Sequence, residues 1–263
     1  MKKFGNFSDA INWSANQLHN YSYIVHTEKW QGKEIKHDPK YAMIETLNLS
    51  FSCHVNPDPV ELVKEIKPNI NWADEHFRER VSGQPLNPPP SHERWPYAQK
   101  NNEEFGGLEK FSHTYPERIW PKNASEISDS VMKGIRYEYG DFSNVVDLMH
   151  REPFTRQAFL PIWFPEDTGA VDGQRVPCTI GYQFIRRFDW VHVVYYIRSC
   201  DFFRHFRDDI YLCLRKLFWL IEELKNKDYE TWKNVKPGTY TMHICSLHAW
   251  SSEKHLLLNK RDI

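Results

Sequence analysis

The chain has 263 residues, of which 15% are aromatic, and a formal net charge of −1 at pH 7. This length and aromatic content suffice for one large core, and we predict a single domain over residues 1–263. The balanced charge offers no field for a polyanion, which argues against a nucleic-acid polymer and leaves a small phosphorylated ligand open.

The five cysteines are an odd number at irregular spacing and include no Cys-x-x-Cys pair. The amino terminus lacks secretory character, and no apolar run is long enough to cross a bilayer. These features predict reduced thiols in a soluble, cytoplasmic protein. His243, His248 and His255 do not fall with other ligands at zinc spacing, so we expect no metal.

Apolar residues recur at helical spacing in the amino-terminal half. Phe7–Tyr21 is predicted as a helix, and Tyr41–Leu49 as a second, short apolar helix that contains Glu45. Pro59–Arg80 is predicted as helical with a break at Pro68. These segments indicate an amino-terminal helical layer.

Gly83–Pro96 contains five prolines and is predicted as an extended loop insertion. Helices are predicted over Ala124–Tyr137 and Asp141–Met149. The apolar, aromatic segment Arg156–Phe164 is predicted as a buried strand.

The carboxy-terminal half begins with an aromatic and β-branched run, Tyr182–Ile197, that predicts paired strands. Apolar residues from Ile210 to Leu224 then recur at the spacing of a helix packed on a sheet. Helices early in the chain and a mostly antiparallel sheet later predict a single α+β domain.

Cys178 lies ahead of these strands, and Arg198 follows them. A cysteine is more often a small buried hydrophobe than a nucleophile. Thiolate chemistry needs a positive environment, which Arg198 would provide if the two strands pair. The alternative is a core cysteine with Arg198 at the solvated end of a strand.

Arg198, Ser199 and Arg156 offer two guanidinium forks and a hydroxyl, which suit a phosphate monoester. Glu45 is a carboxylate in an apolar segment that would bury it, which suits general acid and base work or a buried ion pair with an arginine. His248 follows a strand and fits a structural histidine better than a ligand.

Four segments taken together resemble the thymidylate synthase superfamily, and within it the deoxycytidylate hydroxymethylase branch of large-genome bacteriophages. They are TRQAFLPIW from Thr155, VPCTIGYQF from Val176, IRSCDFFRHFRDDI from Ile197 and SLHAWS from Ser246. An Arg-Ser-x-Asp step, a cysteine 20 residues upstream, an aspartate 8 residues on and a later His-x-aromatic step form a specific combination. The similarity covers roughly Phe154–Ser251 and is thin in the amino-terminal half.

The resemblance implies a mostly antiparallel or mixed sheet packed by helices, with homodimers formed sheet to sheet, in a bacterial or phage-infected host cytoplasm. It implies that Cys178 adds to carbon 6 of a pyrimidine nucleotide and that carbon 5 attacks the one-carbon unit of 5,10-methylenetetrahydrofolate. A synthase reduces the resulting exocyclic methylene, whereas a hydroxymethylase lets water add to it. Glu45 matches the family glutamate that orders water and moves protons, in an Ile-Glu-x-Leu helix.

The resemblance also assigns ligand contacts in the site. They are Arg198 and Ser199 with Arg156 from the partner subunit for the phosphate, His248 and Trp250 for the sugar, and Asp201 and Trp72 for the folate.

Asp209 stands where the synthases have an asparagine that accepts the N3 proton of uracil and donates to O4. Cytosine reverses that pattern, with an acceptor at N3 and an amino donor at N4. A carboxyl group accepts from the amino group and, when protonated, also donates to N3. The resemblance therefore implies that a cytidine nucleotide, dCMP or CMP, is preferred over dUMP.

The sequence departs from the family pattern at several positions. Gln157 replaces the second arginine of the partner-subunit pair, and Thr179 replaces the histidine that follows the synthase cysteine. No tyrosine in Asn87–Trp95 matches the catalytic tyrosine, and Lys29 would have to replace a phosphate-loop arginine. Trp250 in place of tyrosine leaves ribose and deoxyribose open. The alternatives are a divergent thymidylate synthase or hydroxymethylase acting on dUMP, and an inactive nucleotide-binding homologue.

Overall fold

A computed structural model describes residues 1–30, 33–35, 41–94, 111, 113–122, 140–168 and 176–258. Its helices are α1 (Phe7–Asn20), α2 (Pro59–Ile66), α3 (Ile70–Arg80), α5 (Tyr115–Ile119), α7 (Phe142–Arg151), α8 (Phe206–Lys227) and α9 (Tyr229–Trp232). Short 3-10 helices are η2 (Pro90–Arg94), η4 (Pro165–Asp167) and η6 (Ser251–Leu258). The strands are β1 (Lys2–Phe4), β2 (Tyr23–Val25), β3 (Lys29–Trp30), β4 (Lys33–Glu34), β5 (Met43–His54), β6 (Phe159–Pro161), β7 (Thr179–Arg187), β8 (Trp190–Asp201) and β9 (Lys236–Trp250).

Seven of these strands form one open sheet in the order β1-β5-β9-β8-β7-β6, with β2 also paired to β5. The β1–β5 and β8–β9 pairs are parallel, and the other pairs are antiparallel, so the sheet is mixed. Parallel neighbours need a long crossover, which α8 and α9 provide between β8 and β9. The predicted α+β class is confirmed.

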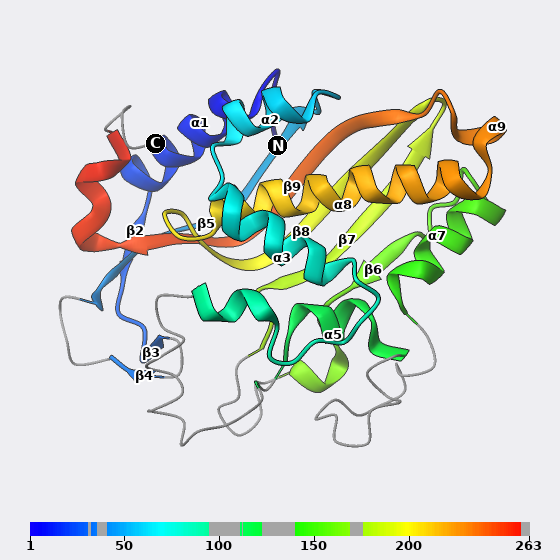
Figure 1. Ribbon diagram of the computed structural model, residues 1–263. Helices are drawn as coiled ribbons and strands as arrows, with labels where there is room; N and C mark the ends of the chain where they lie inside the picture. Colours follow the sequence, from blue (N-terminus) through cyan, green and yellow to red (C-terminus); the bar gives the residue numbers. More distant parts are fainter. Residues whose placement is uncertain are drawn as a thin grey trace.

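The core lies between the helices and one face of this sheet. One cross-strand row of buried side chains runs through Cys53, Tyr240, Val193 and Phe184. Phe7 of α1 packs edge-on against Tyr240 with ring centroids 5.5 Å apart, and Phe142 of α7 stacks on Phe184 at 5.8 Å. Figure 1 shows α8 in front of the sheet, with α1 and α2 near one end of it and α7 near the other. These contacts place α1, α7 and α8 on the same face.

Buried and less buried side chains alternate along the strands, and at one level of the sheet this alternation changes phase, which means that it shifts by one residue. In β5 the change occurs at Asn48, whose φ is 55°, a conformation that asparagine tolerates better than most residues. The register places Cys245 of β9 and Arg198 of β8 level with Asn48, and the pattern changes phase there too. The β7–β8 register shifts between Thr179 and Gly181. Such shifts bend strands and re-aim side chains, so the sheet end beyond this row is turned.

Several elements predicted from periodicity are confirmed. The first predicted helix is α1, and the segment with a proline break is α2 followed by α3. The later helix is α7, the aromatic run is the β7–β8 hairpin, and the long apolar stripe is α8.

Other predictions are wrong or only partly tested. Tyr41–Leu49 is not a helix: the start of β5 covers most of it, because pairing with β2 and β9 outweighs a short apolar pattern. The strand predicted over Arg156–Phe164 is reduced to β6. Gly83–Pro96 is described up to residue 94 and ends in η2 rather than remaining extended. The helix predicted over Ala124–Tyr137 lies outside the described residues.

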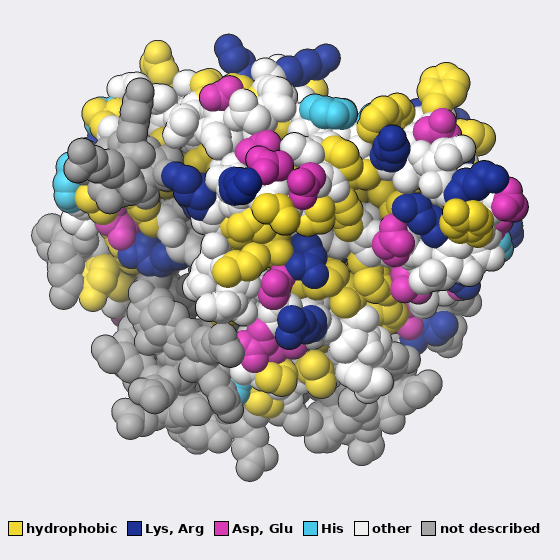
Figure 2. All heavy atoms as spheres, turned by 45° about the horizontal axis from the view of Figure 1, so that its top comes forward, with side chains coloured by type: hydrophobic (Ala, Val, Ile, Leu, Met, Phe, Trp, Pro, Cys, Tyr) yellow, Lys and Arg dark blue, Asp and Glu magenta, His cyan; other side chains and the backbone are white. Residues whose placement is uncertain are grey.

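No helix within the described ranges combines the length and apolarity that crossing a membrane requires. On the face shown in Figure 2, basic and acidic side chains are interspersed among hydrophobic ones. This mixture agrees with the near-zero net charge.

Gly181 occupies a close approach between β7 and β6. A Cβ at this position would lie 2.4 Å from Cζ of Phe159 and 2.8 Å from the carbonyl oxygen of Leu160. Because backbone would have to move, we expect Gly181→Ala to lower the free energy of unfolding by about 1–3 kcal/mol in urea titrations. Gly5→Ala is the control, since its Cβ meets nothing within 4 Å, and equal stability of the two variants would contradict the prediction.

Candidate active site

Four strand ends meet at one end of the sheet. Strand β7 begins there and its antiparallel neighbour β8 ends there. Strand β9 is parallel to β8 and also ends there, and β5, antiparallel to β9, begins there. Most of the side chains predicted to act in a site lie on these four ends or next to them.

Cys178 immediately precedes β7 and is exposed, and none of the five cysteines, all of which lie in the described part of the chain, forms a disulfide. Its carbonyl oxygen accepts a hydrogen bond from the backbone N–H of Arg198 at 2.9 Å, so the predicted strand pairing is confirmed. The Arg198 guanidinium donates to the carbonyl oxygens of Pro177 at 2.8 Å and Val176 at 3.0 Å. Arg198 therefore holds the segment directly ahead of the thiol and brings a positive charge to that segment.

A chain of hydroxyl groups lies next to the thiol. The N–H and Oγ1 of Thr179 both donate to the phenol oxygen of Tyr115, at 3.4 and 3.2 Å. Thr179 Oγ1 also lies 2.9 Å from the phenol oxygen of Tyr195. Burial, and then the charge of nearby Cys178, raise the pKa of Tyr115 to about 12. Tyr115 is therefore protonated near neutral pH, and its own proton is used in neither bond with Thr179.

Asp209 lies in the first turn of α8, where its backbone N–H donates to the carbonyl oxygen of His205 at 2.7 Å. The Cys200 thiol lies 3.6 Å from Asp209 Oδ2 as a donor. Burial raises the pKa of Cys200 well above its ordinary value and also raises the pKa of Asp209. Both shifts favour the protonated forms, so Asp209 has a neutral carboxylic state accessible at higher pH than an exposed aspartate.

Glu45, His248 and Asp201 form one cross-strand row, because Glu45 pairs with His248 and His248 with Asp201. Ser246 Oγ donates to Glu45 Oε1 at 2.5 Å. Burial lowers the pKa of His248, although Asp201 and Glu45 act in the opposite direction, so the imidazole is neutral near pH 7. The structure thus brings together three residues predicted from distant segments.

Asp201 also stabilises the turn that follows β8. Its Oδ1 accepts from the backbone N–H groups of Phe203 at 3.1 Å and Arg204 at 3.0 Å. The Arg204 guanidinium bridges Asp201 Oδ2, at 3.1 Å, and Glu253 Oε1 of η6, at 2.6 Å. A ligand that contacts this carboxylate would share Oδ2 with Arg204.

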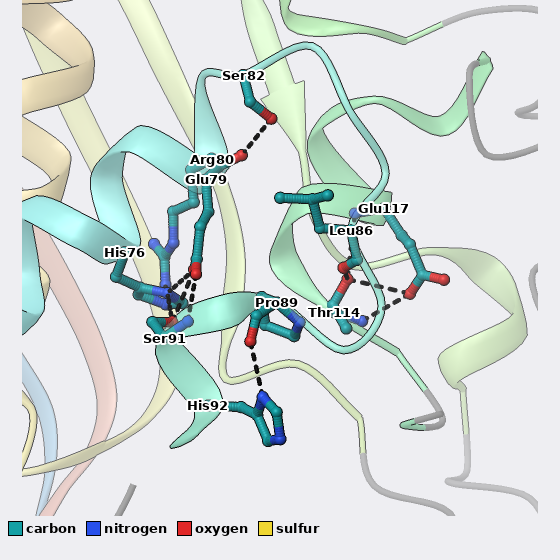
Figure 3. A network of polar contacts seen from close by, with 10 residues as sticks. All are labelled: His76, Glu79, Arg80, Ser82, Leu86, Pro89, Ser91, His92, Thr114 and Glu117. Atoms are coloured by element: carbon teal, nitrogen blue, oxygen red, sulfur yellow. Dashed lines mark hydrogen bonds and ion pairs between the residues drawn. The ribbon is translucent and has the colours of Figure 1, made fainter. Parts of the chain in front are cut away.

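Helix α3 contributes an aromatic ring and a buried polar cluster. Trp72, half-buried, stacks on His76 with ring centroids 4.7 Å apart. His76, Glu79 and Ser91 are mutually hydrogen-bonded, as Figure 3 shows. This is not the arrangement of a serine hydrolase, because Ser91 is 0% exposed and the carboxylate contacts the serine directly.

Of the remaining predicted residues, Arg156 lies at a distance from the thiol of its own chain. Arg156 is exposed, and its carbonyl oxygen accepts from Gln183, four residues along β7 from Thr179, or about 13 Å. Trp250 lies at the end of β9 with its ring 5.3 Å from that of Tyr41. Ser199 is half-buried on β8 beside Ser246, and Lys29 lies in β3.

Three residues of this region were not predicted from the sequence: Tyr115, which is partly buried, and Arg80 and Lys216, which are buried. Thr114 and Glu117 form a capping box that starts α5, a Thr-x-x-Glu signal present in the sequence ahead of Tyr115. Arg80 lies with its guanidinium carbon 4.1 Å from the Tyr115 ring centroid. Lys216 falls within the apolar stripe of α8, with Nζ 4.5 Å from the Tyr182 ring centroid, and no local pattern distinguishes it from a surface lysine.

Among the residues that the structure describes, no group of three or more histidine, cysteine, aspartate or glutamate side chains could hold a metal ion. No protein-family model and no curated protein matches this sequence.

Asp208, the neighbour of Asp209, provides a pH test of this region. Burial raises its pKa from 3.8 to about 6, while Oδ1 accepts from the Asn69 N–H at 2.8 Å. The folded state therefore binds the Asp208 proton more tightly than the unfolded state does. The contribution of this proton to folding stability is fully present below about pH 3.8 and is lost as pH rises through about 6. Asp208→Asn keeps the accepting oxygen and removes the buried charge.

We expect the free energy of unfolding of Asp208→Asn to exceed that of the wild type by up to about 3 kcal/mol at pH 7.5. The difference is expected to be smaller at pH 4. Urea titrations across that range would measure the difference curve. A constant difference at all pH values would contradict the assignment.

Proposed function

We propose that this protein is a folate-dependent hydroxymethyltransferase that acts on carbon 5 of a cytidine nucleotide, dCMP or CMP, as a divergent member of the thymidylate synthase superfamily. The observation that carries the proposal is the position of Cys178. An exposed thiol follows the segment that Arg198 holds, and the charges of both Cys178 and Asp209 act on the phenol of Tyr115. A nucleophile, a base-reading carboxyl group and a proton donor therefore lie in one region.

In the proposed reaction, the Cys178 thiolate forms a bond to carbon 6 of the pyrimidine, and the electron pair of the 5,6 double bond moves to carbon 5. Carbon 5 bonds to the one-carbon unit that 5,10-methylenetetrahydrofolate supplies, while one of the two carbon–nitrogen bonds of that unit breaks and the freed nitrogen takes a proton. Carbon 5 then loses its proton to a base, and the bond to tetrahydrofolate breaks, which leaves an exocyclic methylene. Water adds to that methylene, its surplus proton leaves, and the Cys178–carbon 6 bond breaks.

Asp209 supports a cytosine substrate. The raised pKa of Asp209 favours a protonated carboxyl group, which donates to N3 while its second oxygen accepts from the N4 amino group. Cys200 Sγ donates to Oδ2 of the same carboxyl group and helps to orient it. Uracil presents a donor at N3 and an acceptor at O4, and fits this arrangement less well.

Glu45 is proposed to order water and move protons at the ring, and His248 to contact the sugar. Ser246 donates to Glu45, which fixes one carboxylate oxygen, and the neutral imidazole of His248, hydrogen-bonded to the Ser246 backbone, offers its other ring nitrogen to a sugar hydroxyl. Trp250 would add an indole N–H.

Phosphate and folate contacts are also part of the proposal. Ser199 and Arg198 would bind the phosphate, although the Arg198 side chain already donates to two carbonyl oxygens. Trp72 is half-buried and offers an aromatic surface for the pterin, and Asp201 would contact it through Oδ2.

A homodimer would place Arg156 of the second copy near this region. Helices α1, α7 and α8 pack on one face of the sheet, whereas the opposite face carries half-buried apolar side chains such as Ile185, Val194 and Tyr196. Pairing of two sheets through that face would bury these side chains. Arg156 is exposed, as a residue donated to a partner must be.

The first test incubates the protein with methylenetetrahydrofolate and CMP, dCMP or dUMP, and measures product masses and dihydrofolate. We expect a hydroxymethyl mass gain on a cytidine nucleotide without dihydrofolate, and loss of at least about 100-fold in rate for Cys178→Ala. Cys245→Ala is the matched control, because that thiol is also exposed. Dihydrofolate formation would indicate a synthase, and nucleotide binding without turnover would indicate an inactive homologue. Full activity of Cys178→Ala would exclude the covalent mechanism.

The second test concerns the base. Asp209→Asn replaces the carboxyl group by an amide that matches uracil, so kcat/KM for dUMP relative to the cytidine nucleotide is expected to rise by about 10-fold or more. An unchanged ratio would show that Asp209 does not read the base.

A further inference from the structure

A buried charged network joins α3 to η2 (Figure 3). The Glu79 carboxylate accepts from the backbone N–H and Oγ of Ser91 and lies 3.1 Å from His76 Nδ1. Arg80 Nη2 lies 2.7 Å from His76 Nε2. The exposed fractions of His76, Glu79 and Arg80 are 3%, 5% and 3%, so the network is shielded from water.

The network fixes the tautomer of His76. Arginine has only donors, so His76 Nε2 must be the acceptor of the bond from Arg80. His76 Nδ1 therefore carries the proton and directs it to Glu79 and Ser91. Burial, and then the charge of Arg80, lower the pKa of His76 well below its ordinary value, which agrees with a neutral ring. The imidazole thus holds Arg80 without cancelling its charge.

The guanidinium of Arg80 contacts the ring of Tyr115 as well as the imidazole of His76. Its guanidinium carbon lies 4.1 Å from the Tyr115 ring centroid, within the range of a cation–π contact. Among the described residues, Arg80 Nε has no hydrogen-bond partner. Burying a charged guanidinium costs free energy. The hydrogen bond to His76 and the cation–π contact with the Tyr115 ring offset this cost.

We propose that Arg80 is a positioning residue that holds the phenol of Tyr115 against Thr179, beside Cys178. The inference rests on the proposed function in assuming that this phenol exchanges a proton with the pyrimidine ring. Thr179 holds the phenol oxygen at one end, and Arg80 fixes the plane of the ring. The positive charge of Arg80 also opposes the rise that burial imposes on the pKa of Tyr115.

A purely structural role for the network would anchor η2, which contains Ser91, to α3. That role predicts a loss of stability but no specific dependence on Tyr115. The two roles are therefore separable by a variant that keeps the charge of Arg80 and loses its planar stacking.

The experiment compares Arg80→Lys with Arg215→Lys. Arg215 is a matched control, because its guanidinium carbon lies 4.4 Å from the Phe77 ring centroid and it pairs with Asp74 of the same helix α3. We expect Arg80→Lys to lower kcat by about 10- to 100-fold with little change in KM, the effect of a misplaced proton donor. Arg215→Lys is expected to stay within about 2-fold.

A double variant shows whether Arg80 acts through Tyr115. If it does, Arg80→Lys adds no further loss of kcat to Tyr115→Phe, because the group that it positions is already gone. The inference is overturned if the two losses of kcat multiply in the double variant, or if Arg80→Lys has a normal kcat. Should Arg80→Lys fail to fold, Glu79→Gln removes the carboxylate toward which His76 Nδ1 donates, which weakens the hold on the imidazole that supports Arg80, and is expected to lower kcat in the same direction.

A readout without turnover keeps this inference separate from the proposed function. Fluorine NMR of the protein labelled with meta-fluorotyrosine gives a Tyr115 resonance, assigned by its absence in Tyr115→Phe. Arg80→Lys is expected to move that resonance and Arg215→Lys to leave it in place. An unmoved resonance overturns the positioning role even in an active enzyme, whereas a moved resonance with no turnover on any nucleotide leaves the positioning intact and rejects the proposed function.

Discussion

The parallel pairing of β8 with β9 is the constraint on which the site depends. Two parallel neighbours cannot be joined by a turn, so the chain must return along the sheet, and α8 makes that return. The helix can lie there because its apolar stripe covers the buried rows of β5, β7, β8 and β9. The first turn of α8, with Asp209, is consequently held where β8 ends and β7 begins, and Cys178 lies at that same point.

Burial then sets the protonation states at this end of the sheet. It raises the pKa of Asp209, Cys200 and Tyr115 and lowers that of His248, so four groups are displaced toward their neutral forms. Two arginines lie where a polar contact supports them: Arg198 on carbonyl oxygens and Arg80 on an imidazole. An environment of neutral donors with a few fixed cations suits a reaction in which a thiolate forms and protons move at a ring.

The sequence predicted the long elements well, because α8 and the β7–β8 hairpin have clear periodicity. It failed for the segment around Glu45, where a short apolar run fits a helix and a buried strand equally, and only pairing with β9 decides. Tyr115 was missed because its contact with Thr179 joins residues 64 positions apart. Buried Arg80 was missed for a related reason: nothing local distinguishes it from a surface arginine until α3, η2 and α5 are packed together.

Arg198 connects the fold to the proposed chemistry most directly. It lies level with Asn48 and Cys245, in the row where the burial pattern of three strands changes phase. Its guanidinium donates to the carbonyl oxygens of Val176 and Pro177, just before the thiol. Because β8 ends where β7 begins, one side chain of β8 both holds the segment ahead of Cys178 and brings a positive charge to that segment.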